Sequence, residues 1–198
     1  MYYLIGYNGS RNKKIEEAQN KFFIYTLLGS LFLLLSIALL SFQLGTTDYQ
    51  IFNIAYITPY YQKFLWLGFF IAFAVKTPIW PAHIWLPLAH GESSTGISVI
   101  LAGILLKLGT YGIFRFCLSP TLYSGGVIYF LPYILMLAII SIIYSCISAI
   151  SLLDLKAIVA YSSVAHMNIS ILGLFSNSLN GMVGAYLYSI SHGLVSGG

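Results

Sequence analysis

The chain has 198 residues, of which 59% are hydrophobic and only 7% are charged, and its formal net charge is +4. Soluble domains carry about 25% charged residues, so this composition excludes a water-soluble globular protein and indicates a membrane protein. The sparse positive charge also excludes a nucleic-acid-binding surface. The two cysteines, Cys117 and Cys146, stand in apolar runs, where we expect buried thiols rather than a disulfide or a metal site.

Apolar runs long enough to span about 30 Å of hydrocarbon follow one another along the whole chain, so we treat residues 1–198 as a single transmembrane region. In chain order, we expect the tail of a helix at 1–7, full spans near 22–42, 64–88, 97–118, 126–153 and 157–175, and a partial span at 182–198. Helices are expected throughout, because a helix satisfies its own backbone polar groups in lipid. The predicted fold class is an all-α membrane protein, a polytopic transmembrane helix bundle. Both ends fall inside apolar runs, which favours an internal fragment or a split-gene product.

The basic residues indicate how this bundle is oriented. Arg11, Lys13, Lys14 and Lys21 share one loop, and Lys156 falls on the same side by helix count. Loops rich in lysine and arginine remain on the cytoplasmic or matrix side of the membrane. We therefore expect these loops to lie on that face.

A lysine and several prolines interrupt the apolar run at 64–88. Lys76 lies near the middle of this run, where a charged lysine costs about 2.5–3.5 kcal/mol. Pro78, Pro81 and Pro87 follow it, and each lacks the N–H that continues a helix. Backbone groups freed in lipid must face protein or water, so we expect a discontinuous helix with a polar, hydrated point at its break. The alternative is a lysine that only pairs with an internal carboxylate.

Three further residues extend this pattern onto the following helices. Lys107 lies near the centre of 97–118, and His166 and His192 fall on the last two helices. A lysine in apolar surroundings can gain and lose a proton, and both nitrogens of a histidine can relay one. Alternatively, Lys107 is a fixed counter-ion and the histidines are structural. Secondary candidates for the same path are His83, His90, Lys156 and Glu92.

Other chemistry is not indicated by the sequence. The chain has no cysteine cluster typical of an iron–sulfur centre, no phosphate-binding loop and no histidine spacing typical of metal or haem ligation. We therefore expect no catalytic residue, no metal and no cofactor bound by this chain.

A resemblance to a known family rests on three stretches, "FFIAFAVKTPIWPAHIWLPLAHGESSTGISVILAGILLKLGTYGIFRF", "DLKAIVAYSSVAHMNISILGLF" and "SHGLVSGG". They resemble the chain 4 family of respiratory complex I (NADH:ubiquinone oxidoreductase), whose members are antiporter-like subunits of its membrane arm. The resemblance implies part of an inverted-repeat fold with one discontinuous helix. It matches Lys76 and Lys107 to the family's two buried lysines, and His166 and His192 to the histidines of its central hydrophilic axis. The family also uses a glutamate that would precede Met1 and a charged residue that would follow Gly198.

The function implied by the resemblance is proton translocation driven by the oxidation of NADH by ubiquinone. The complex uses FMN, iron–sulfur clusters, NADH and ubiquinone in other subunits. The implied partners are the other membrane-arm subunits, including adjacent antiporter-like subunits, separate fragments that carry the rest of this subunit, and membrane lipids, but no nucleic acid. The high content of phenylalanine, tyrosine, isoleucine and serine suits an AT-rich organelle genome, which favours the mitochondrial inner membrane over a bacterial plasma membrane. Two alternatives remain: a subunit of a multi-subunit sodium/proton antiporter, and a structural scaffold whose lysines only pair with carboxylates.

Overall fold

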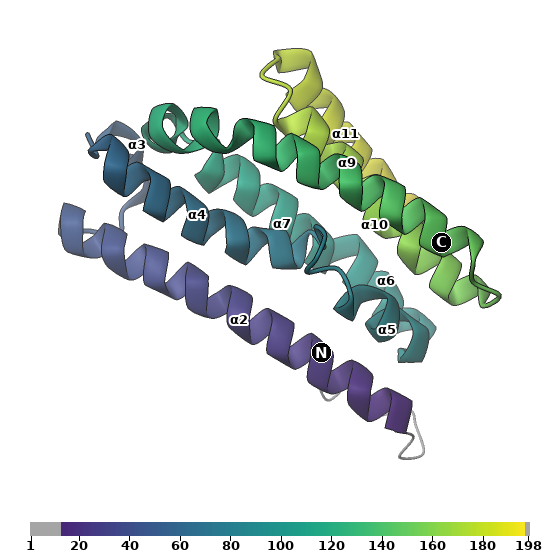
Figure 1. The fold of residues 1–198 in the computed structure, drawn as a ribbon. Coiled ribbons are helices and arrows are strands. Elements are labelled where there is room, and N and C mark those ends of the chain that lie inside the picture. Colours follow the sequence, from purple (N-terminus) through teal and green to yellow (C-terminus); the bar gives the residue numbers. More distant parts are fainter. Residues whose placement is uncertain (1–12, 197–198) are drawn as a thin grey trace.

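A computed structural model describes residues 13–196, which contain helices and no strand (Figure 1). The helix tail expected at 1–7, Arg11 and Gly198 lie outside these residues. The first half of the described chain contains α2 (Lys13–Leu44), α3 (Tyr49–Ile54), α4 (Pro59–Lys76) and α5 (Trp85–Glu92). The second half contains α6 (Thr95–Ile100), η1 (Leu101–Leu105), α7 (Leu106–Gly112), η2 (Ile113–Cys117), α8 (Pro120–Leu122), η3 (Tyr123–Val127), α9 (Ile128–Ile150), α10 (Leu155–Leu174) and α11 (Leu179–Val195).

The helices form a membrane-type bundle. Within residues 13–196, four helices are long and apolar enough to cross a membrane: Lys13–Leu44, Thr95–Cys117, Pro120–Ile150 and Leu155–Leu174. The expected spans at 22–42, 97–118, 126–153 and 157–175 fall on these four. The expected span at 64–88 instead divides into α4, a non-helical segment and α5, and the span at 182–198 overlaps α11. The short helix α3 was not expected from the sequence.

Local signals in the sequence explain where several helices begin. The carboxylate of Asp48 accepts a hydrogen bond from Gln50 N at the start of α3, and Asp154 does the same for Lys156 N at the start of α10. Such caps satisfy backbone donors that have no partner within the helix. Pro59 begins α4, at a position where its missing N–H is not needed.

The membrane helix from Thr95 to Cys117 contains two π-helical segments, η1 and η2, and η3 leads into α9. In a π-helical turn each N–H reaches back five residues, which widens the helix locally. Such turns often mark functional sites. Here η1 comes directly before the helical turn that carries Lys107.

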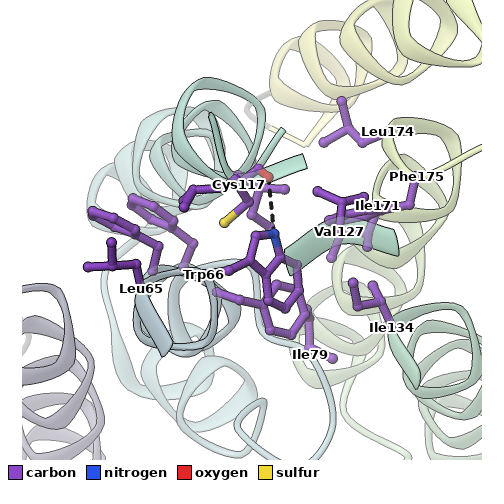
Figure 2. Close-up of a cluster of buried hydrophobic side chains, with 14 of the residues drawn as sticks. Leu65, Trp66, Ile79, Cys117, Val127, Ile134, Ile171, Leu174 and Phe175 are labelled. Carbon is purple, nitrogen blue, oxygen red and sulfur yellow. Dashed lines mark hydrogen bonds between the residues drawn. The ribbon is translucent and has the colours of Figure 1, made fainter. Parts of the chain in front are cut away.

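The main apolar core surrounds Trp66 of α4 (Figure 2). Its ring stacks on Phe70 with centroids 4.8 Å apart and on Phe130 at 5.0 Å. Its indole N–H donates to the carbonyl of Cys117, 3.0 Å away, so the polar end of this buried side chain has a partner. The core joins α4 to η2, η3, α9 and α10, and thereby fixes the helix that leads to the break.

Both cysteines are free thiols. Cys117 is completely buried in this core, as expected. The expectation of a buried thiol was wrong for Cys146, which is exposed. Its side of α9 faces away from the other described helices, so only lipid or a protein part outside residues 13–196 can cover it.

The two ends of the bundle differ in their charges. The beginning of α2 packs against α5, where the rings of Phe22 and Trp85 lie 5.4 Å apart. The side chain of Lys156, at the start of α10, reaches the same end. At the opposite end, Arg115 lies over the ring of Tyr49 and Lys63 over the ring of Tyr129. The positive-inside rule assigns the first end to the cytoplasmic or matrix face.

Candidate functional site

The break in the membrane helix begins directly after Lys76, the last residue of α4, and ends at Trp85. Protein groups satisfy the carbonyls of the last helical turn. The indole of Trp85 donates to Val75 O at 2.9 Å, Ile79 N donates to Ala74 O at 3.0 Å, and Thr77 donates to Phe73 O. The break is therefore a built feature of the fold, because its freed backbone groups find defined partners.

Two neighbouring helices also hold the break. Ser141 of α9 accepts a hydrogen bond from Trp80 N at 2.6 Å. The side-chain amide of Asn168, on α10 and fully buried, donates to Val164 O at 2.8 Å and to Pro78 O at 3.4 Å. Pro78 and Pro81 lie in the break itself, whereas Pro87 lies within α5. Sequence reasoning identified the prolines but missed Trp85, Ser141 and Asn168.

Lys76 stands at the edge of the break and is only partly buried. Within residues 13–196 its amine forms no ion pair and no hydrogen bond. The chain has five acidic residues, and all lie near helix ends or in loops: Glu16, Glu17, Asp48, Glu92 and Asp154. None falls inside a membrane-spanning apolar run, so a carboxylate for Lys76 must come from outside the described residues.

Helix α7 packs directly on the break through glycine. A Cβ atom at Gly109 would lie 2.5 Å from Thr77 Cγ2, 2.9 Å from Thr77 N and 3.1 Å from the carbonyl carbon of Lys76. A Cβ at Gly112 would overlap the ring of Phe73 at 2.2 Å. Small residues let neighbouring helices approach closely, and Gly109 and Gly112 do so here. This close approach places Lys107, two residues before Gly109, on the helix that covers the break.

Lys107 contacts a different helix, α11, through His192. Its Nζ lies 2.8 Å from Nδ1 of His192 and donates to the carbonyl of Ala102 at 2.5 Å. Ala102 belongs to the π-helical segment η1, and Gly193 lets the two helices meet, because a Cβ there would lie 3.3 Å from Lys107 Cε. A lysine and a histidine that the sequence separates by 85 positions therefore form one hydrogen-bonded pair.

His166 joins this pair from α10. Its ring centroid lies 5.6 Å from that of His192, and its Nδ1 is hydrogen-bonded to the hydroxyl of Tyr188. Sequence reasoning missed Tyr188. The signal was available, because Tyr188 and His192 are four residues apart and share one face of α11.

Two cavities meet at the lysine–histidine pair. The first has a volume of about 390 Å³ and is lined by Val159, Ser162, His166, Tyr188, Ser191, His192, Val195 and Ser196. The second, of about 350 Å³, is lined by Lys107 together with residues of α6, η1 and α11. Lys107 thus faces one cavity and His192 the other. The hydrogen bond between them links two spaces that are large enough to hold water.

The serines near the histidines each donate to a carbonyl of their own helix, three residues earlier. These residues are Ser162, Ser163, Ser189 and Ser191. Ser162 and Ser191 still line the first cavity, and Ser189 lines the second. A hydroxyl oxygen that donates once can still accept, so these side chains can bind water in the cavities.

The secondary candidates occupy two other places. His83 is buried in the break, with its ring 5.1 Å from that of Tyr144, and its Nδ1 has no protein partner in residues 13–196. His90, near the end of α5, is also buried, and its Nε2 has no protein partner in residues 13–196. The structure does not bring His83 to the Lys107–His192 pair.

Lys156 and Glu92 lie at the end of the bundle where α10 begins. The amine of Lys156 donates to the carbonyl of Ser93, whose hydroxyl donates to His90 O at 3.3 Å. Glu92 is the last residue of α5 and is partly buried. In the described part of the chain, no group of three or more His, Cys, Asp or Glu side chains could hold a metal ion.

The chain is similar in sequence to proteins of a known family. The family of NADH:quinone oxidoreductase/Mrp antiporter transmembrane proteins matches residues 1–198. The NADH-ubiquinone oxidoreductase chain 4 of Marchantia polymorpha is 52% identical over 196 residues, and that of Acanthamoeba castellanii is 47% identical over 198. The matches cover 99% and 100% of this chain but 39% of each relative.

Solved structures agree on the fold. A chain of respiratory complex I from Thermus thermophilus matches with a TM-score of 0.88 and 28% identity, over 99% of this chain and 42% of that chain. A chain of the Mrp complex from Dietzia sp. matches with a TM-score of 0.85 and 20% identity, over 99% and 36%. The predicted fold class, a polytopic helix bundle of the antiporter-like type with a discontinuous helix, is confirmed.

Proposed function

We propose that this chain, which belongs to the NADH:quinone oxidoreductase/Mrp antiporter transmembrane family, carries part of a proton path in the membrane arm of respiratory complex I. The observation that carries this proposal is the contact of 2.8 Å between Lys107 Nζ and His192 Nδ1, where two cavities meet. A partly buried lysine paired with a histidine instead of a carboxylate has a neighbour that can take its proton.

The proposed path runs from the break towards His166. Lys76, at the end of α4, is the first group, and α7 packs against the adjoining backbone through Gly109. Lys107 passes a proton from its ammonium group to Nδ1 of His192, and His192 releases its Nε2 proton towards His166 across the first cavity. Each step moves one proton between nitrogen atoms and leaves the covalent skeleton unchanged.

The energy for this movement comes from outside the chain. A carboxylate elsewhere in the subunit pairs with Lys76 in one state of the cycle and separates from it in another. The nearby negative charge stabilises the ammonium form, and its removal favours release of the proton. His90, His83, Lys156 and Glu92 are secondary groups that connect the path to the cytoplasmic or matrix face.

The proposal extends to the assembly around this chain. Residues 1–198 form one transmembrane region of a larger subunit, since the chain spans about 39% of the curated relatives that it matches. The subunit lies in the mitochondrial inner membrane beside other antiporter-like membrane-arm subunits, parts that carry the rest of the subunit, and lipid. NADH, FMN, the iron–sulfur clusters and ubiquinone act in other subunits, and electrons do not pass through this chain.

Lysine substitutions in the assembled complex test the proposal. The complex is reconstituted in liposomes, and NADH-driven proton uptake is measured per assembled complex for Lys76→Ala, Lys107→Ala and the control Lys63→Ala. Removal of a proton-transfer group costs about 10²–10⁴ in rate, so we expect at least a tenfold loss of proton flux for the first two variants and little change for the third. Normal NADH-driven turnover together with an unchanged ratio of protons to electrons in Lys76→Ala and Lys107→Ala would remove both lysines from the mechanism.

A sodium/proton antiporter subunit is the second candidate, since the family includes Mrp antiporters. The two functions differ in what drives the flux. Sodium-dependent proton flux without NADH, in a complex that lacks flavin and iron–sulfur subunits, would favour the antiporter. Full proton flux after neutral substitutions at both lysines would instead favour the scaffold.

A further inference from the structure

We propose that Tyr188 is a positioning residue for His166: its phenol oxygen holds the imidazole in the tautomer that presents a bare Nε2 to the first cavity. This inference rests on the proposed proton path and adds a residue that the sequence did not single out. It follows from how the two imidazoles at the cavity are bonded.

Both histidines are held through the same ring atom. Nδ1 of His192 is bonded to Lys107 Nζ, and Nδ1 of His166 is bonded to the hydroxyl of Tyr188. In residues 13–196 neither Nε2 atom has a protein hydrogen-bond partner, and both rings line the first cavity, with centroids 5.6 Å apart. The Nε2 atoms are therefore the positions through which the two rings can exchange a proton, directly or through water in the cavity.

The hydrogen-bond partner at Nδ1 limits whether Nε2 of the same ring can act as a donor or as an acceptor. The Lys107 ammonium group can only donate, so neutral His192 accepts at Nδ1 and carries its proton on Nε2. The hydroxyl of Tyr188 can donate or accept; in the proposed arrangement it accepts, so neutral His166 carries its proton on Nδ1 and keeps Nε2 free. Nε2 of His192 is then a donor and Nε2 of His166 an acceptor, which is the arrangement that one transfer requires.

In this arrangement, the protons that are lost and gained balance. Lys107 loses one proton to Nδ1 of His192, His192 gives up its Nε2 proton, and His166 gains that proton on Nε2. His192 ends neutral as its other tautomer, and His166 becomes an imidazolium. The Nδ1–H bond to Tyr188 persists before and after the transfer, so the ring of His166 does not have to turn to receive the proton.

The neighbouring Tyr186 provides a matched comparison on the same helix. Tyr186 is also partly buried and packs its ring on Phe114, with centroids 4.7 Å apart. Its hydroxyl has no hydrogen bond to another group in residues 13–196. Tyr186→Phe therefore removes a tyrosine hydroxyl from the same helix without removing a hydrogen bond to a histidine.

The experiment measures NADH-driven proton uptake per assembled complex in liposomes, in H₂O and in D₂O, for Tyr188→Phe, Tyr186→Phe and Lys107→Ala. Loss of the hydrogen bond should slow proton flux about two- to tenfold in Tyr188→Phe. The solvent isotope effect should rise in that variant, because transfer to His166 then limits the rate. Tyr186→Phe should match the unmodified complex in both measurements.

The outcomes distinguish a failure of the role inferred for Tyr188 from a failure of the proposed proton path. If Tyr188→Phe equals Tyr186→Phe while Lys107→Ala loses its flux, the role of Tyr188 is refuted and the proton path stands. If Lys107→Ala retains full flux, the proposed function fails. Should Tyr188→Phe not assemble, Tyr188→Gln and Tyr188→Leu replace it, since a glutamine carbonyl can accept from Nδ1. Flux at least twofold higher with glutamine supports the inference, and equal flux overturns it.

Discussion

Gly109→Ala should disturb the contact between α7 and the helix break, and the structure allows its cost to be worked out. A Cβ at this position would meet Thr77 N at 2.9 Å and the carbonyl carbon of Lys76 at 3.1 Å, whereas ordinary contacts begin at 3.4 Å. The nearest atom it meets is the side-chain carbon Thr77 Cγ2, at 2.5 Å, and the other two are backbone atoms of a segment that hydrogen bonds from Trp85 and Asn168 hold in place. Helix α7 must therefore retreat by about half an ångström.

Overpacking of this kind costs about 1–3 kcal/mol. Alanine in place of glycine inside a helix also gains about 0.5–1 kcal/mol. Gly184→Ala on α11 shares that gain without the clash, since its Cβ would meet nothing within 4 Å among residues 13–196. The two variants should differ by the overpacking term alone, about 2 kcal/mol, which corresponds to about a thirtyfold change in the ratio of folded to unfolded protein.

The assay heats membranes that contain each variant and measures the assembled complex that remains on native gels. We expect the Gly109→Ala complex to be lost at a lower temperature than the Gly184→Ala complex. Its proton flux should also fall, because the retreat of α7 moves Lys107 relative to the break. Equal thermal stability of the two variants would show that the backbone of the break shifts to accept the added Cβ. That result would refute the conclusion that the break is rigidly held.

Two further substitutions test polar contacts that the sequence did not indicate. Trp85→Phe should cost about 1–3 kcal/mol, because it leaves Val75 O without its donor at the end of α4. Amide hydrogen exchange at Thr77, Ile79 and Trp80 should accelerate, and unchanged exchange would contradict this. Gln62→Leu removes a bond to Ile57 O at 2.7 Å and one from Gly125 N at 2.8 Å. It should lower the thermal stability of the complex more than Gln50→Leu, because the side chain of Gln50 on α3 is exposed. Equal stabilities of the two variants would contradict that role of Gln62.

The break could be predicted from the sequence because its causes are local. Lys76 and the prolines after it act within a few residues, and a helix cannot continue cleanly through Pro78 and Pro81. The positions of the long helices were predictable for the same reason, since an apolar run of sufficient length favours one helix.

The partners within the site could not be predicted, because they depend on packing between distant segments. Nothing in the sequence near Lys107 points to His192, and the contact exists because Gly193 admits the lysine and η1 widens the helix before it. In the sequence, Asn168 is an ordinary polar residue of the helix α10. Its contact with the break depends on how α10 packs in the folded bundle. The roles of Lys76, Lys107, His166 and His192 remain predictions.

The junction between the two cavities also has a consequence for ion selectivity. The groups that face one another there are the amine of Lys107 and the imidazole of His192, and one backbone oxygen, from Ala102, lies against the amine. A sodium ion crosses a protein only where several oxygen atoms replace its hydration shell. The ammonium group of Lys107 repels such a cation, yet in the proposed path it passes a proton to Nδ1 of His192 without displacing any heavy atom. In the proposed path, the same contact therefore passes protons and excludes alkali metal ions.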